Sequence, residues 1–185
     1  MSDGDRMQAP PPPATPVDPE QTPVDPAETP ADPDETSAVA ERPTIRVGGF
    51  LQHEGRILVV KQGRGEERYW LLPGGGVRFG ETLSEALRRE FDEELALRVA
   101  VGRLLAIVES ISPEPAYPKH VVHLVFEVSA APEADIIPQE AAVLRAEFLD
   151  ERGLSTVDLR PPIAEFLLDC LRELPSSPQY LGRRW

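Results

Sequence analysis

The sequence predicts an α+β domain of mixed strands and two helices, preceded by a disordered tail. Three observations predict this fold class. Proline-rich, acidic sequence fills residues 1–43. Short apolar, β-branched runs then recur between Thr44 and Leu149, as strands require. Two segments with helical spacing of apolar residues interrupt or follow these runs. With 185 residues, the chain is long enough for one domain over 44–185 plus this appendage.

The N-terminal tail, residues 1–43, holds 11 of the 21 prolines. The units TPVDPEQ, TPVDPAE and TPADPDE repeat with a period of seven between Thr15 and Glu35. The tail also carries −8 of the net charge of −13. Such proline and charge content predicts a disordered, semi-extended segment. A solubilising tail and a docking arm for a basic partner both fit this composition.

The first strands are expected on either side of a turn. Thr44–Gln52 and Arg56–Gln62 read as two strands, and His53–Gly55 between them reads as a turn. The two strands should therefore form a hairpin. Tyr69–Leu72 is a short strand that leads into a run of glycines.

The second half of the domain should contain three strands and a final helix. The strands are expected over Arg98–Ile111, His120–Ser129 and Ala146–Leu149. Gly102 is a candidate bulge within the first of them. The helix is expected over Arg160–Leu174, with two prolines in its first turn and Cys170 on its apolar stripe. We expect the aromatic and basic end, Tyr180–Trp185, to pack back on the domain or across a dimer.

The central helix has an unusual concentration of carboxylates. Thr82 and Glu85 form a capping box at its start. Glu90, Glu93 and Glu94 then share one face, because they are spaced i, i+3 and i+4. Like charges at this spacing repel one another. The pattern is typical either of a solvated acidic face or of a site for a hard divalent cation such as Mg²⁺.

The glycines before this helix favour the second interpretation. Pro73-Gly74-Gly75-Gly76 suits neither a helix nor a strand interior. It suits a loop whose backbone approaches a ligand or an ion closely. The combination therefore predicts a metal-binding loop and helix.

These residues also resemble a known motif. Gly75, Glu81 and the string Arg89-Glu90-Phe91-Asp92-Glu93-Glu94 have the spacing of the Nudix box, which closes here at Leu97. The one departure is Ala96, where the family has glycine. The resemblance implies a Nudix-type α/β/α sandwich with a mixed β-sheet between helices. It also implies hydrolysis of phosphoric anhydride bonds, the activity of a nucleotide pyrophosphatase.

The resemblance further implies roles for particular residues. Arg89 would orient the glutamates by ion pairing, and Mg²⁺, with Mn²⁺ as an alternative, would be the cofactor. The general base would be a glutamate of the box or one from a later loop, for which Glu140 is the candidate. The implied metal ligands are Gly74 through its carbonyl, Glu90, Glu93 and Glu94, with Glu81 close by; the implied catalytic residues are Glu93, Glu94, Arg89 and Glu140.

Nudix enzymes cleave a nucleoside diphosphate linked to a variable group, so substrate binding calls for cations and an aromatic. Arg46, Lys61 and Arg78 are the phosphate-binding candidates. Phe79 is the first candidate for base stacking, with Tyr69 and Tyr117 as alternatives, and Tyr69 also fits a core position. A proline sixteen residues past the box is associated with ADP-ribose hydrolases, and Pro113 has this spacing. Tyr117, at twenty residues, matches the dinucleoside-polyphosphate type less well. An ADP-ribose-like substrate is therefore favoured.

Two other functions stay open. One is a pyrophosphohydrolase of oxidised or noncanonical nucleoside triphosphates. The other is a nucleotide-binding regulatory module, although the presence of all four box glutamates favours an enzyme.

Composition limits the partners. The domain keeps a net charge of −5, which disfavours a nucleic-acid-binding face. No apolar run approaches the length of a membrane span and Met1–Pro10 has no signal-peptide core. The lone Cys170 fits a reducing compartment. We expect a cytoplasmic protein with a small nucleotide substrate, and the family resemblance favours a homodimer.

Overall fold

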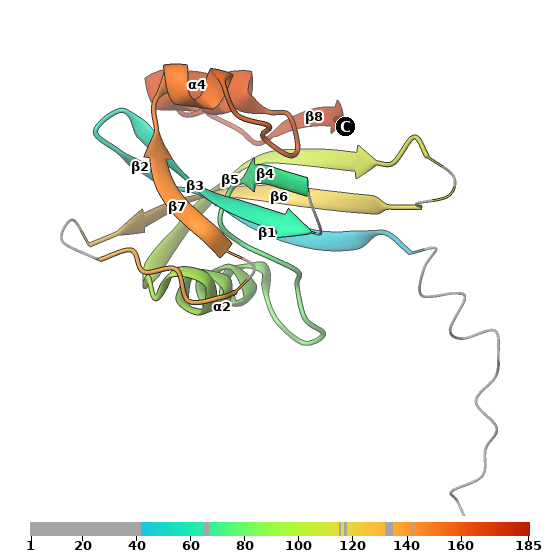
Figure 1. The fold of residues 1–185 in the computed structure, drawn as a ribbon, viewed down its shortest axis with the longest axis horizontal. Helices are drawn as coiled ribbons and strands as arrows, with labels where there is room; N and C mark the ends of the chain where they lie inside the picture. The colour runs from blue at the N-terminus through green and yellow to red at the C-terminus, as the bar shows by residue number, and fades with distance from the viewer. Residues whose placement is uncertain (1–41, 65–66, 115, 117, 132–134, 142) are drawn as a thin grey trace, which may run out of the picture. The chain divides into compact units, whose positions relative to one another are not determined.

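The computed structural model describes residues 42–64, 67–114, 116, 118–131, 135–141 and 143–185. These residues form three layers, with α2 on one side of the strands and α4 on the other (Figure 1). The α/β/α sandwich is thereby confirmed, whereas the predicted tail lies almost entirely outside the described residues. The strands are β1 (Thr44–Phe50), β2 (Gln52–His53), β3 (Arg56–Arg64), β4 (Glu67–Leu71), β5 (Val99–Ile111), β6 (His120–Ala130), β7 (Val143–Leu149) and β8 (Gln179–Arg183); the helices are α2 (Leu83–Leu95), α3 (Glu151–Ser155) and α4 (Ala164–Arg172).

The middle layer consists of two four-stranded sheets rather than one. In the first sheet, with the order β1-β6-β5-β8, β1 runs parallel to β6, β5 is antiparallel to β6, and β8 is parallel to β5. This sheet is mixed, as predicted. The β5–β6 register shifts between Val101 and Leu104, so the bulge expected at Gly102 is confirmed.

In the second sheet, β3 pairs antiparallel with β2, β4 and β7. The hairpin predicted from Thr44–Gln52 is therefore largely wrong. Both edges of β1 are already used, because β6 pairs with one edge and the glycine segment bonds to the other. The chain changes sheets near Leu51, whose carbonyl accepts the Leu58 N–H at 2.9 Å. Only Gln52–His53 then pair with β3.

Two hydrophobic cores flank the strands. Leu87, Phe91 and Leu95 of α2 belong to the first core. Leu167 and Cys170 of α4 belong to the second, which confirms Cys170 as a buried apolar residue. Alternate residues of β3 divide between the two cores, as the two-residue period of a strand requires. Leu58 and Val60 face the core of α2, and Ile57 and Val59 face the core of α4.

The C-terminal third differs most from the prediction. The final helix begins at Ala164 rather than Arg160, so its prolines precede it. The preceding segment is not helical: Arg160 donates its N–H to the Trp70 carbonyl at 2.8 Å, Leu159 bridges Trp70, and the Ile163 N–H donates to the Pro161 carbonyl at 2.8 Å in a tight turn. α3 was not predicted, and β7 is longer than predicted. The chain end does pack back on the domain, as the unpredicted strand β8.

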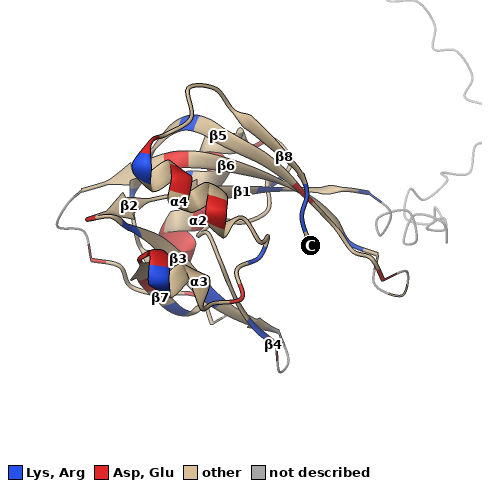
Figure 2. Cartoon of the chain, turned by 90° about the horizontal axis from the view of Figure 1, so that it is seen from above, with Lys and Arg blue, Asp and Glu red and all other residues tan. Residues whose placement is uncertain are grey.

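Charge is distributed over the described elements without an obvious division. Figure 2 shows Lys and Arg segments interspersed with Asp and Glu segments on the side that it presents. Among the described residues, no helix combines the length and apolar character needed to cross a membrane.

Candidate active site

The glycine segment runs between β1 and α2. The carbonyl of Gly75 accepts the Val47 N–H at 2.9 Å, which fastens the segment to the edge of β1. Gly74 has φ +137°, and a Cβ there would lie 2.2 Å from the Val47 carbonyl oxygen. A Cβ on Gly75 would lie 2.2 Å from the Glu90 carboxyl carbon. Only glycine allows the backbone to pass this close to both elements.

Helix α2 starts and ends at defined caps. The capping box is confirmed: Thr82 Oγ1 accepts the Glu85 N–H at 3.2 Å, and Glu85 accepts the Thr82 N–H at 2.8 Å. At the other end Ala96 takes the left-handed conformation, with φ 51° and ψ 31°. The alanine therefore ends the helix in the conformation that glycine usually supplies, and no ligand residue is displaced.

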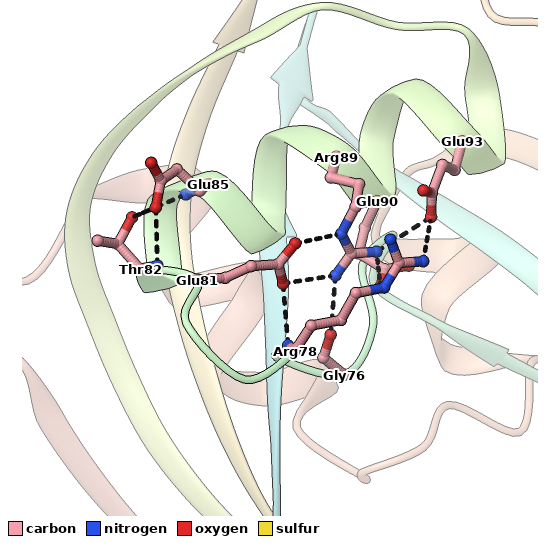
Figure 3. Close-up of polar contacts among 8 residues, drawn as sticks. All are labelled: Gly76, Arg78, Glu81, Thr82, Glu85, Arg89, Glu90 and Glu93. Carbon is pink, nitrogen blue, oxygen red and sulfur yellow. Dashed lines mark hydrogen bonds and ion pairs between the residues drawn. The ribbon is translucent and has the colours of Figure 1, made fainter. Parts of the chain in front are cut away.

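Four charged side chains form what we call the Arg89 clamp: Arg89, Glu81, Glu90 and Glu93 (Figure 3). Arg89 bonds both oxygens of Glu81, with Nε–Oε1 at 2.6 Å and Nη2–Oε2 at 2.9 Å. Its Nη1 donates to Glu90 Oε1 at 2.6 Å and to Glu93 Oε2 at 3.0 Å. Nη2 also donates to the Gly76 carbonyl at 3.0 Å, which ties the clamp to the glycine segment.

These contacts change the acidity of the clamp. The hydrogen bonds from Arg89, and then the backbone bond from Arg78, lower the pKa of Glu81 to about 2. The hydrogen bond to Glu81 also raises the pKa of Arg89. Glu81 is therefore held as a carboxylate at any neutral pH.

Arg78 and Phe79 lie at the outer side of the clamp. Arg78 Nη2 donates to Glu93 Oε2 at 3.2 Å, and its backbone N–H donates to Glu81 Oε2 at 2.9 Å (Figure 3). Phe79 follows in the loop and is fully exposed to solvent. Of the two predicted substrate-binding residues of the loop, Arg78 is ion-paired to a carboxylate, and Phe79 is its exposed neighbour in the chain.

Glu94 lies in a different environment from its neighbour Glu93. Its side chain is buried, with the residue 2% exposed. Oε2 accepts the Gly74 N–H at 2.9 Å, and Oε1 accepts the Gln62 amide N–H at 3.0 Å. Burial raises the pKa of Glu94 to about 7, despite the opposing effects of the Gly74 hydrogen bond and the Arg46 charge. Both donors are neutral, so Glu94 has no salt bridge among the described residues.

The structure separates the two cations predicted on the first strands. Arg46 is half-buried, donates to the Leu72 carbonyl at 3.2 Å, and lies close enough to interact electrostatically with Glu94. Burial lowers the pKa of Arg46. Lys61 instead lies on the other face of β3, with Nζ 5.7 Å from the centroid of the Trp70 ring. Arg46 is brought to the carboxylates and Lys61 is not.

Glu140 lies in a loop fastened to the end of α2. The Gln139 N–H donates to the Glu94 carbonyl at 2.9 Å, and the Ile137 N–H donates to the Leu95 carbonyl at 3.0 Å. The Glu140 side chain is exposed, and its charge contributes to the raised pKa of Glu94. The loop therefore brings Glu140 to the carboxylates, as its prediction required.

Gln62 is the site residue that sequence reasoning missed. The signal was present in the alternation of β3, because Leu58 and Val60 face the core of α2 and Gln62 is the next residue on that face. The alternation therefore places this polar side chain on the face of β3 that packs against α2 and its carboxylates. Gln62 is uncharged, so a pattern of phosphate-binding cations points to its neighbour Lys61 instead.

A hard divalent cation needs several oxygen ligands that converge on one point. Within the described ranges, no three acidic, histidine or cysteine side chains already stand in a metal-holding arrangement, and the Arg89 guanidinium lies among Glu81, Glu90 and Glu93. The donor chemistry nevertheless fits a hard cation. Each Glu94 oxygen keeps a lone pair, and no donor among the described residues reaches the Gly74 carbonyl. A buried carboxylate without a salt bridge is costly unless a cation compensates its charge.

The chain is similar to known proteins in both sequence and fold. The NUDIX domain model matches residues 42–170. The ADP-ribose pyrophosphatase of Methanocaldococcus jannaschii is 35% identical over 85 residues, which are 45% of this chain and 49% of that protein. The low-salt glycan biosynthesis protein Agl8 of Haloferax volcanii is 35% identical over 99 residues, 49% of this chain and 62% of that protein.

These matches cover about half the length of the curated relatives. The crystal structure of a NUDIX hydrolase from Nitrosomonas europaea is similar to the present structure, with a TM-score of 0.60 and 21% identity. The similarity covers 76% of this chain and 80% of that one. At this identity the likeness shows the fold alone.

Proposed function

We propose that this chain, which belongs to the NUDIX family, is a metal-dependent hydrolase. It would cleave the diphosphate linkage of a nucleoside diphosphate derivative. One observation carries the proposal: a buried Glu94, next to the Arg89 clamp, touches the glycine segment and has no salt bridge among the described residues. The proposed substrate is ADP-ribose or a close analogue, and the products are AMP and ribose 5-phosphate.

Glu90, Glu93, Glu94 and the Gly74 carbonyl would hold Mg²⁺, with Glu81 behind them. When bound, Mg²⁺ neutralises phosphate charge and lowers the pKa of bound water. Mn²⁺ has the same preference for oxygen ligands and is expected to substitute.

The chain's own residues supply orientation and proton transfer. Arg89 holds Glu90 and Glu93 in fixed positions through Nη1. Arg46 is half-buried on β1, donates to the Leu72 carbonyl and interacts electrostatically with Glu94 and Glu90, and it would contact a phosphate oxygen. Glu140, exposed beside the end of α2, would accept the proton of the attacking water.

Recognition of the base would fall to the glycine loop. Phe79 is fully exposed and can stack on a nucleobase. Arg78 would exchange its contact with Glu93 for a phosphate once metal occupies the carboxylates.

The name of the M. jannaschii relative and the position of Pro113 support ADP-ribose as the substrate. The described Pro113 is exposed in the connection between β5 and β6.

The test is hydrolysis of a substrate panel by the full chain with Mg²⁺. The panel comprises ADP-ribose, other nucleotide sugars, dinucleoside polyphosphates and nucleoside triphosphates. We expect release of AMP from ADP-ribose and a loss of about 100-fold or more in Glu94→Gln, because a metal ligand and its charge are removed. Glu165→Gln is the matched control, since Glu165 is exposed on α4.

Two outcomes would contradict this assignment. Preferential release of pyrophosphate from a triphosphate would move the protein to the nucleotide-sanitising class. Nucleotide binding without turnover of any substrate would identify a regulatory module.

A further inference from the structure

We propose that Gln62 is a positioning residue that holds the Glu94 carboxylate in its metal-binding orientation. The inference rests on the proposed function, because it assumes that Glu94 binds the metal. It concerns a residue outside the box motif, on a strand rather than on the helix or the glycine loop.

The contact geometry defines the orientation of the carboxylate. Gln62 Nε2 donates to Oε1 at 3.0 Å, and the Gly74 N–H donates to Oε2 at 2.9 Å. One donor therefore restrains each oxygen of Glu94. Removing Gln62 would leave a single restraint, and the terminal torsion of a glutamate is soft. Each oxygen still has a lone pair for a metal ion while both donors are in place.

The chemical type of the donor matters as well as its position. Arg89 binds Glu81, Glu90 and Glu93 but makes no hydrogen bond with Glu94. A guanidinium at this position would neutralise the carboxylate and compete with a cation for it. The Gln62 amide orients Glu94 without cancelling its charge.

The strand architecture fixes the Gln62 backbone on both sides. Gln62 pairs with Tyr69 of β4 on one edge and with Val143 of β7 on the other. The β3–β7 register shifts between Lys61 and Gln62, so that Leu144 has no partner and a bulge lies at this point. The extra residue belongs to β7, so the alternation of β3 that directs Gln62 toward α2 is undisturbed.

The bulge also connects Gln62 with the candidate base. Its paired residue Val143 donates its N–H to the Glu140 carbonyl at 3.0 Å. The same strand junction therefore supports Gln62 and ends the loop that carries Glu140.

The test measures metal binding in the absence of nucleotide. The full chain is titrated with Mn²⁺, and the free ion is followed by electron paramagnetic resonance. We expect Gln62→Met to weaken Mn²⁺ binding about tenfold, as loss of a partner of a metal ligand typically does. Gln52→Met is the matched control, because Gln52 is exposed on β2, and it should bind Mn²⁺ like the wild type.

A double-variant cycle separates positioning from a general effect on folding. If Gln62 acts only through Glu94, then Gln62→Met should cause no further loss of Mn²⁺ affinity in the Glu94→Gln background. Gln62→Asn is the second variant, since its amide is one methylene short of Glu94. Should Gln62→Met fail to fold, Gln62→Asn alone must show the tenfold loss.

Three results would overturn the inference: unchanged Mn²⁺ affinity in the Gln62 variants, additive losses in the double variant, or no Mn²⁺ binding by the wild type. Failure of the proposed function looks different. A protein that turns over no substrate of the panel, but loses Mn²⁺ affinity in Gln62→Met, would keep the inference and lose the hydrolase assignment.

Discussion

Glu93 and Glu94 are neighbours on α2, yet the protein stabilises their charges in opposite ways. Glu93 lies in the Arg89 clamp, where a cation binds it and water reaches it. Glu94 is buried and is held by two neutral N–H groups. The charge of Glu93 is compensated by Arg89, whereas Glu94 has no salt bridge among the residues that the structure describes. The carboxylate that most needs a cation is therefore the one that local pairing leaves available.

The largest effect on the free energy of unfolding should come from Glu94, whose contribution depends on pH in the opposite direction to that of Glu81. The pKa of Glu94 is raised to about 7 from an ordinary value of 4.5. Its protonated form thus stabilises the fold fully below pH 4.5, and this contribution is lost as pH rises through 7. The loss is about 3 kcal/mol. In EDTA, Glu94→Gln should flatten the decline of the unfolding free energy between pH 5 and 7, measured by urea titration.

Glu81 provides the contrast. Its pKa is lowered to about 2, so its contribution is present above pH 4.5 and is lost as pH falls toward 2. Glu81→Gln should therefore change the acid limb and leave the limb between pH 5 and 7 as in the wild type. Identical curves for the two variants would contradict the comparison.

Removing the Arg89 guanidinium should have the next largest effect on the free energy of unfolding. Arg89→Met leaves Glu81, Glu90 and Glu93 without their shared partner. We expect a loss of about 2 kcal/mol in the free energy of unfolding in EDTA, less than for a fully buried pair because the clamp is partly open to water. Added Mg²⁺ should restore stability more in this variant than in the wild type.

The control for this prediction is Arg172→Met. Arg172 pairs with Asp169 on the exposed side of α4, and its loss should cost less than about 0.5 kcal/mol. Equal losses in the two variants would show that the clamp is an ordinary surface network.

The glycine segment contacts both Glu94 and the Arg89 clamp, and a substitution in it should have a smaller effect. Gly75→Ala places a Cβ 2.2 Å from the Glu90 carboxyl carbon, so Glu90 must move. We expect a loss of about 1 kcal/mol in stability and weaker Mn²⁺ binding. Gly76→Ala is the matched control, because no neighbouring atom lies within 4 Å of its added Cβ. Both quantities should be measured on the same preparations, and a silent Gly75→Ala would contradict the close packing.

The smallest effect should come from the end of α2. Ala96 is held at φ 51°, which is unfavourable for a residue with a Cβ. Ala96→Gly should raise the unfolding free energy by about 0.5–1 kcal/mol and leave Mn²⁺ affinity unchanged. A stabilised protein with altered metal affinity would show that the helix end and Glu94 are coupled.

The sequence was most informative where structure depends on neighbours along the chain. The capping box at Thr82 and Glu85, the helix after it and the bulge at Gly102 all follow from local chemistry. The carboxylate cluster was likewise predictable from spacing on one helix. The pairing of β1 was not, because the alternating pattern of a strand does not name its partner.

Two further misses have similar causes. The prolines after Arg160 fit a first helical turn, but a hydrogen bond from Arg160 to Trp70 and a tight turn at Pro161 keep that segment out of the helix. Gln62 carries no charge and belongs to no motif, so its contact with Glu94 became visible only when β3 was placed against α2. Tertiary contacts decided both positions.

The link between α2 and the Glu140 loop has a consequence for how such a site can diverge. The spacing between Glu94 and Glu140 is set by main-chain bonds from Ile137 and Gln139 to the last turn of the helix. The exposed side chains at the end of this loop can therefore be exchanged without changing that spacing, whereas Ile136 packs against the core of α2. Insertion or deletion of one residue would move Glu140 relative to Glu94, so relatives with different chemistry at this site should differ in loop length more than in loop composition.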